Sequence, residues 1–174
     1  MTVLTILEVP DPGLRAVAAP VAAVDDGVRA TVADMLETMY DARGIGLAAT
    51  QVGIERRIFV MDLQEPEEED GDPVRHPIAF INPEILSVSD ETSIYNEGCL
   101  SIPEQYAEVE RPTRCRVKWL DADGKGHEED MDGLMATCVQ HEIDHLNGVL
   151  FTDHISKLKR DMLMKKLAKL RKAA

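Results

Sequence analysis

His141-Glu142-Ile143-Asp144-His145 is the stretch around which the rest of this 174-residue sequence is organised. On a helix, residues four positions apart point the same way from successive turns, so the two histidines share one face. Two imidazoles at this spacing can hold one divalent metal ion, and the glutamate between them can take the proton of a metal-bound water. The alternative is a surface helix with two solvated histidines, because a five-residue pattern also recurs by chance.

The composition is that of a globular protein large enough to bury a core. Apolar residues make up 44% and charged residues 29%, whereas aromatics at 4% leave Val, Ile, Leu and Met to fill the interior. No run is long enough to span a membrane, and the N-terminus lacks the basic start of a signal peptide. Three cysteines do not suggest a disulfide framework. We expect one cytoplasmic domain over 1–174, with no membrane partner.

The charge is distributed unevenly. A net charge of −13 argues against a general nucleic-acid binder, so no DNA partner is expected. The segment 156–174 nevertheless holds eight Lys or Arg against one Asp, which gives about +7 there and about −20 for the remainder. Such a basic segment indicates either a docking helix for an anionic partner or a solvated helix face.

We predict an α+β fold with antiparallel strands packed around a central metal-binding helix and helices near both ends, and apolar spacing places the individual helices and strands. The central helix should run from about Gly133 to Asn147, with Asp132 as its N-cap and Gly148 as its C-terminal stop.

The flanking helices follow from similar spacing. An N-terminal helix should begin after a cap at Asp25 or Asp26 and end near Arg43. A last helix should begin at Ile155. Its apolar side is expected to hold Leu158, Met162, Leu167 and Leu170.

Strands are expected over 57–63, 78–81, 84–88, 93–102, 106–109 and 114–120. The Asn82-Pro83 pair should separate the second strand from the third, and Pro103 the fourth from the fifth. The segment 121–132 partly matches a calcium-binding loop, but such a loop needs a helix on both sides. A β-hairpin turning at Asp123-Gly124 is the better interpretation.

A catalytic metal site needs a third protein ligand and an open position. Proteases with this motif commonly take a downstream glutamate or a histidine six residues after the second one, but no Glu follows Glu142, and that position is Phe151. Asp153 and His154 lie nearby and stay open as ligands.

Upstream, Cys99 is the candidate within Glu97-Gly98-Cys99-Leu100-Ser101, because a thiolate is a strong ligand for zinc or ferrous iron. The alternative for any single cysteine is a small buried hydrophobic residue. We expect that alternative for Cys115 and Cys138.

The stretch Gly44-Ile45-Gly46-Leu47-Ala48-Ala49-Thr50-Gln51 faintly matches a dinucleotide-binding turn. That turn needs a strand before it and a helix after it, whereas the order here is reversed. Its glycines more plausibly allow another backbone to come close, as a peptide-binding edge requires.

Three stretches, 44–51, 97–101 and 140–145, resemble the three motifs of bacterial peptide deformylase in the same order. The similarity extends through 81–84, 101–104 and 144–148 and so covers nearly the whole chain. The resemblance implies a hydrolase that removes the formyl group from the N-formylmethionine of newly synthesised polypeptides and releases formate.

The resemblance also implies that Cys99, His141 and His145 bind one divalent metal ion. Ferrous iron is the expected metal in the cell, with zinc or nickel as alternatives. The metal-bound water would attack the formyl carbon, while Glu142 takes its proton and passes it to the departing amine.

Further roles follow from the same resemblance. The Gln51 side-chain amide and the Leu100 backbone N–H would stabilise the negative carbonyl oxygen. Many members have Arg where this chain has Tyr106, which leaves contacts beyond methionine open. Substrate contacts are expected at Gly44, Gly46, Tyr95, Glu97, Leu134, Thr137 and Cys138. The basic helix over 156–174 would dock on the ribosome.

Three rival hypotheses remain. A metallopeptidase would use the two histidines and a downstream ligand. A thiol enzyme would use Cys99 as nucleophile with His141 as its base. A structural metal module would bind the ion without needing Glu142.

Overall fold

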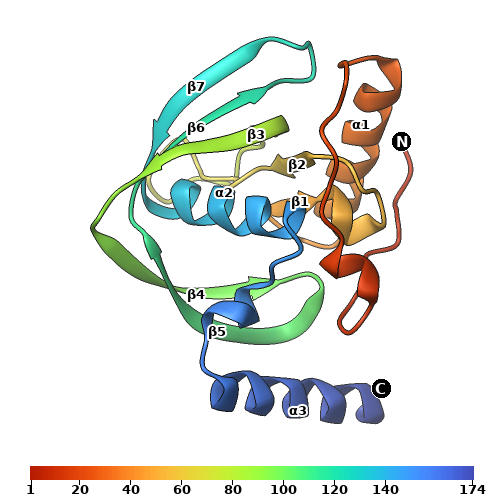
Figure 1. The fold of residues 1–174 in the computed structure, drawn as a ribbon, viewed down its shortest axis with the longest axis vertical. Helices are drawn as coiled ribbons and strands as arrows, with labels where there is room; N and C mark the ends of the chain where they lie inside the picture. The colour runs from red at the N-terminus through yellow and green to blue at the C-terminus, as the bar shows by residue number, and fades with distance from the viewer.

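The structure, a computed structural model, describes residues 1–174 and places helix α2 (Gly133–Leu146) between two antiparallel sheets (Figure 1). The α+β prediction is confirmed. The larger sheet has the order β1 (Gly46–Ala48), β2 (Ile58–Met61), β3 (Ile78–Val88), β6 (Cys115–Leu120) and β7 (Gly126–Met131). The smaller sheet pairs β4 (Thr92–Cys99) with β5 (Ile102–Pro112).

Helices α1 (Asp26–Asp41) and α3 (Lys157–Ala173) lie on the outside of this arrangement (Figure 1). α1 packs against β1 and β2, and α3 packs against β5. Asp25 caps α1 by accepting a hydrogen bond from the Val28 N–H at 2.9 Å. Three short 3₁₀ helices complete the chain: η1 (Pro12–Arg15), η2 (Ala49–Val52) and η3 (Phe151–His154). No helix is both long enough and apolar enough to span a membrane.

α2 is fixed by an apolar stripe that faces the larger sheet. Ala136, Val139 and Leu146 are fully buried in the same cluster as Phe59 and Phe80. The two phenyl rings stack with centroids 4.4 Å apart, and Trp119 packs beside Phe80. This packing presents the opposite face of α2, with its histidines, to the smaller sheet.

The bounds of α2 agree with those predicted from the sequence, but the predicted side-chain cap does not form. Asp132 occupies the N-cap position, yet its side chain makes no capping hydrogen bond. The chain enters the helix through Gly133 at φ +53°, outside the helical region, so the first N–H groups are not aligned with the Asp132 carboxylate. The hairpin between β6 and β7 forms as expected, with Gly124 at φ +80°.

Two expected strand breaks are wrong. β3 runs without interruption through Asn82-Pro83, because a bulge with Asn82 at φ +50° absorbs the irregularity. The Asn82 amide exchanges two hydrogen bonds with the Val21 backbone, at 2.7 and 2.8 Å. β5 likewise continues through Pro103, which lies near the start of a strand with one unpaired edge and so removes no required donor.

The buried side of α3 also differs from the expectation. The helix begins at Lys157 after a Ser156 cap, and it buries Leu163 and Leu167 against the smaller sheet. Leu158 and Met162 instead face solvent, 71% and 52% exposed. The expected apolar side is therefore right for Leu167 but wrong for Leu158 and Met162, and Leu163, which we did not expect there, is buried beside Leu167.

Candidate active site

Cys99, His141 and His145 bring three donor atoms together between β4 and α2. Cys99 Sγ lies 3.3 Å from His145 Nε2, which lies 3.2 Å from His141 Nε2, and all three atoms lie within 4.8 Å of one another. Metal–nitrogen bonds of about 2.0–2.1 Å in a tetrahedron place ligand atoms about 3.3 Å apart. The donor set therefore fits one divalent first-row metal ion.

The downstream alternatives do not join this cluster. Asp153 pairs with Arg15 at 2.6 Å, and His154 Nε2 lies 2.8 Å from Asp144 Oδ2. The third donor beside the two histidines is the upstream thiol.

The environment of the two histidines sets their protonation. Burial lowers the pKa of His145 well below its ordinary value, so the ring offers a lone pair. Burial alone would lower the pKa of His141 too, but hydrogen bonds with Cys99 and Glu97 outweigh it and raise the pKa to about 10. If His141 Nε2 held a metal ion, it would have to lose that proton.

A buried ion pair lies behind His141, and sequence reasoning missed it. Glu97 accepts a hydrogen bond from His141 Nδ1 at 2.8 Å, and Arg111 holds the same carboxylate. Burial would raise the pKa of Glu97, but these hydrogen bonds outweigh it and hold the pKa below its ordinary value. The sequence did carry one signal for Arg111. Side chains two residues apart on a strand point to the same face, so Arg111 shares the inward face of β5 with Ala107 and Val109.

Glu142 has a buried carboxylate that makes no hydrogen bond with the protein. Its Oε1 lies 4.0 Å from His141 Nε2, and its buried Oε2 has no hydrogen-bond partner. Burial raises the pKa of this carboxyl to about 7. A Cβ on Gly46 would lie 2.8 Å from Glu142 Oε1, so the glycine leaves room for this carboxylate. We expected Gly46 to let a substrate backbone come close. The structure shows that this glycine also leaves room for the Glu142 side chain.

Gln51 lies in η2, fully buried beside the cluster. Its Oε1 accepts a hydrogen bond from the Ala48 N–H at 2.9 Å, so Nε2 must point the other way. That nitrogen lies 3.1 Å from Ser101 Oγ and 3.5 Å from Cys99 Sγ. The amide is thereby held with its donor toward the candidate metal position.

These side chains line one pocket of about 470 Å³. Every predicted site residue except the buried His145 borders it; their individual roles stay predictions. Leu134, Thr137 and Cys138, from the first turns of α2, and Tyr95 supply part of its wall. Cys115 lies instead in the core, as expected of a small hydrophobic residue. The remaining predicted residues at the pocket are Gly44, Gly46, Gln51, Glu97, Cys99, Leu100, His141 and Glu142.

Tyr106 forms part of the rim and is 65% exposed. It pairs with Gly98 across the β4–β5 ladder, and its ring covers that glycine, where a Cβ would lie 2.5 Å from Tyr106 Cε1. Because Gly98 has no side chain, the Tyr106 ring can extend over β4 to the pocket.

Comparisons with known proteins identify the family of the chain. The family model described as polypeptide deformylase matches residues 3–161. The peptide deformylase of Rhizorhabdus wittichii is 62% identical over 173 residues, covering 99% of this chain and 98% of the relative. The crystal structure of peptide deformylase from Ehrlichia chaffeensis matches with a TM-score of 0.91 at 41% identity, covering 99% of this chain and 98% of that one. The Legionella pneumophila enzyme gives 0.89 at 43% identity, with 99% and 97% covered. The chain therefore belongs to the polypeptide deformylase family, metal-dependent hydrolases that remove the formyl group from the N-formylmethionine of nascent polypeptides.

Proposed function

We propose that the chain, as one catalytic domain over 1–174, hydrolyses N-formylmethionyl peptides with Glu142 as general base and acid. The observation that carries this proposal is a buried Glu142 carboxylate that makes no hydrogen bond and lies beside three converging metal donors at one pocket. A structural metal module would not need such a carboxylate, since burying one without a partner costs stability.

Cys99, His141 and His145 would hold the metal. One sulfur and two nitrogen donors suit both ferrous iron and zinc, and we propose Fe²⁺ as the ion used in the cell. When bound, the metal supplies Lewis acidity, which polarises a carbonyl oxygen and brings the pKa of a coordinated water to about 7.

Glu142 would move the proton. A carboxyl whose pKa is about 7 can accept a proton from the attacking water and then give it to the leaving amine nitrogen. Gly46 leaves the space that this carboxylate occupies. Gln51 Nε2 and the Leu100 N–H would donate to the carbonyl oxygen as negative charge develops.

The composition of the pocket wall supports a formylmethionine substrate. Leu134, Thr137, Cys138 and Tyr95 surround a space that suits an unbranched apolar side chain. Glycines 44 and 46 would offer main-chain hydrogen bonds to an extended peptide, because β1 is an edge strand that pairs only with β2 and leaves its other edge open. Glu97 borders the pocket, but its carboxylate is engaged by His141 and Arg111.

Replacing Gln51 with Ala should lower kcat for formate release by about 10²–10³-fold, because one preorganised donor to the oxyanion is lost. KM should change much less. The matched control is Gln140→Ala, a buried glutamine whose amide donates to Pro112 and Ala136 carbonyls outside the pocket. Equal rate losses in both variants would contradict the oxyanion role.

The function itself is tested by comparing formyl-Met-Ala-Ser with acetyl-Met-Ala-Ser as substrates. Only the formyl peptide should be hydrolysed, with formate as product. Activity should disappear on chelation and return with Fe²⁺, Ni²⁺ or Zn²⁺. Cleavage between Met and Ala would favour the metallopeptidase, and turnover by metal-free protein that stops on Cys99 alkylation would favour the thiol enzyme.

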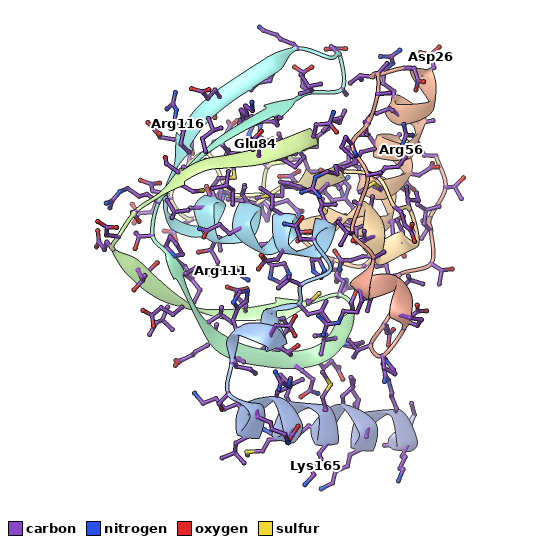
Figure 2. The ribbon with its side chains drawn as sticks, viewed as in Figure 1. Asp26, Arg56, Glu84, Arg111, Arg116 and Lys165 are labelled. Carbon is purple, nitrogen blue, oxygen red and sulfur yellow. The ribbon has the colours of Figure 1, made fainter.

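We further propose that α3 docks this cytoplasmic enzyme on the ribosome. Its outer face carries exposed Lys165, Lys166, Lys169 and Lys172, and Lys165 points away from the body of the molecule (Figure 2). The acidic remainder of the chain would be repelled by RNA, so binding would be confined to this face. Co-sedimentation with ribosomes should weaken with salt and after Lys→Glu changes at 165 and 169; unchanged binding would contradict the docking role.

A further inference from the structure

Arg111 joins the two elements that carry the metal ligands, and it lies between α2 and the β4–β5 sheet (Figure 2). Its Nε and Nη2 donate to the two oxygens of Glu97 at 2.7 and 3.0 Å, and its Nη1 donates to Asp144 Oδ2 at 2.8 Å. Glu97 precedes Cys99 by two residues on β4, and Asp144 is adjacent to His145 on α2. One guanidinium therefore fixes β4 and α2 relative to each other where the ligands lie.

Arg111, Glu97 and Asp144 form a largely buried hydrogen-bond network and not a surface ion pair. The side chains of Arg111 and Glu97 are each 6% exposed, and that of Asp144 is 24% exposed. Asp144 is held from its outer side as well, because His154 Nε2 lies 2.8 Å from the same Oδ2. Only the planar fork of an arginine can serve two carboxylates in fixed directions at once.

The network reaches the ligands by two routes. Glu97 accepts the hydrogen bond from His141 Nδ1 at 2.8 Å and so sets the orientation of that ring. Asp144 lies on the same turn of α2 as His145 and ties that turn to β5. Neither Arg111 nor Asp144 lines the pocket, so neither can act by touching substrate.

We propose that Arg111 is a positioning residue for the metal centre, which aligns the β4 thiol with the α2 histidines through Glu97 and Asp144. The competing explanation is that Arg111 only neutralises a buried Glu97 and stabilises the fold. The proposal rests on the metal-binding part of the proposed function but does not require deformylation.

The test uses Arg111→Lys and Asp144→Asn in the full chain, loaded with Co²⁺. Lysine keeps the charge but loses the fork, and asparagine removes one of the two routes while leaving the Glu97–His141 contact in place. Each variant should bind metal about 10–100-fold more weakly by chelator competition, as is typical when an outer partner of a ligand is changed. The visible Co²⁺ bands should shift, and kcat should fall while KM stays close to the wild-type value.

Arg116→Lys is the matched control, since this surface arginine also serves two carboxylates, Glu128 and Asp130. It should leave metal affinity and the Co²⁺ spectrum unchanged. Wild-type affinity and spectrum in folded Arg111→Lys and Asp144→Asn proteins, even with a lower melting temperature, would overturn the proposal in favour of a purely structural role. If the metal readouts shift as expected but the wild-type protein releases no formate, the proposed function fails and this inference stands.

Discussion

Glu142→Gln should keep its metal and lose about 10²–10⁴-fold in kcat for formate release, which is the range that a positioned proton-transfer group contributes. Glutamine is nearly the same size and fits beside Gly46, but its amide cannot accept and return a proton. Because Glu142 is not one of the three converging donors, metal content by elemental analysis should stay at the wild-type level.

The matched control is Glu129→Gln, which removes a carboxylate of the same kind from an exposed position on β7. Its rate should equal that of the wild type. Undiminished turnover by Glu142→Gln would exclude the assigned role and leave a structural metal module as the better explanation.

Cys99→Ala should abolish metal binding and reduce formate release to the background rate. The substitution leaves only two imidazole nitrogens and removes the anionic sulfur that completes the donor set. Elemental analysis after dialysis gives the result without an activity assay. Loss of metal separates this site from a metallopeptidase with a downstream ligand, in which the same variant would keep its ion.

Cys115→Ala provides the comparison for the loss of a thiol. Cys115 lies in the core and burial raises the pKa of its thiol to about 11, so it has no metal-binding role. This variant should retain the ion and most of the activity, at some cost in melting temperature from the small cavity. Equal metal loss in the two variants would indicate general unfolding.

The elements that sequence reasoning located well are those whose signals are local. α1 and α2 were placed to within about two residues, because apolar spacing and end signals lie within each segment itself. The same logic failed at Asn82-Pro83 and Pro103. A local turn signal there is overridden by contacts that cannot be read locally: the hydrogen bonds of Asn82 to Val21, and the free edge of β5.

The candidate site shows the same division. The two histidines and Glu142 follow from one helix, whereas Cys99 needed the elimination of downstream ligands and a family resemblance. The pairing of Arg111 with both Glu97 and Asp144 was not predicted, since it joins residues separated by 14 and 33 positions. The alternation of side chains along β5 indicates that Arg111 faces inward, but it does not predict which carboxylates the guanidinium contacts.

The placement of the ligands on β4 and α2 has a consequence for the lifetime of the enzyme in the cell. Cys99 and His145 are 46 residues apart, so a bound ion closes a long loop much as a cross-link would. An ion that binds only the folded chain stabilises it by mass action, so resistance to unfolding should rise and fall with the metal supply. Metal starvation would then lower the amount of enzyme through proteolysis as well as its activity, and the proteolytic half-life would report the metal supply of the cell.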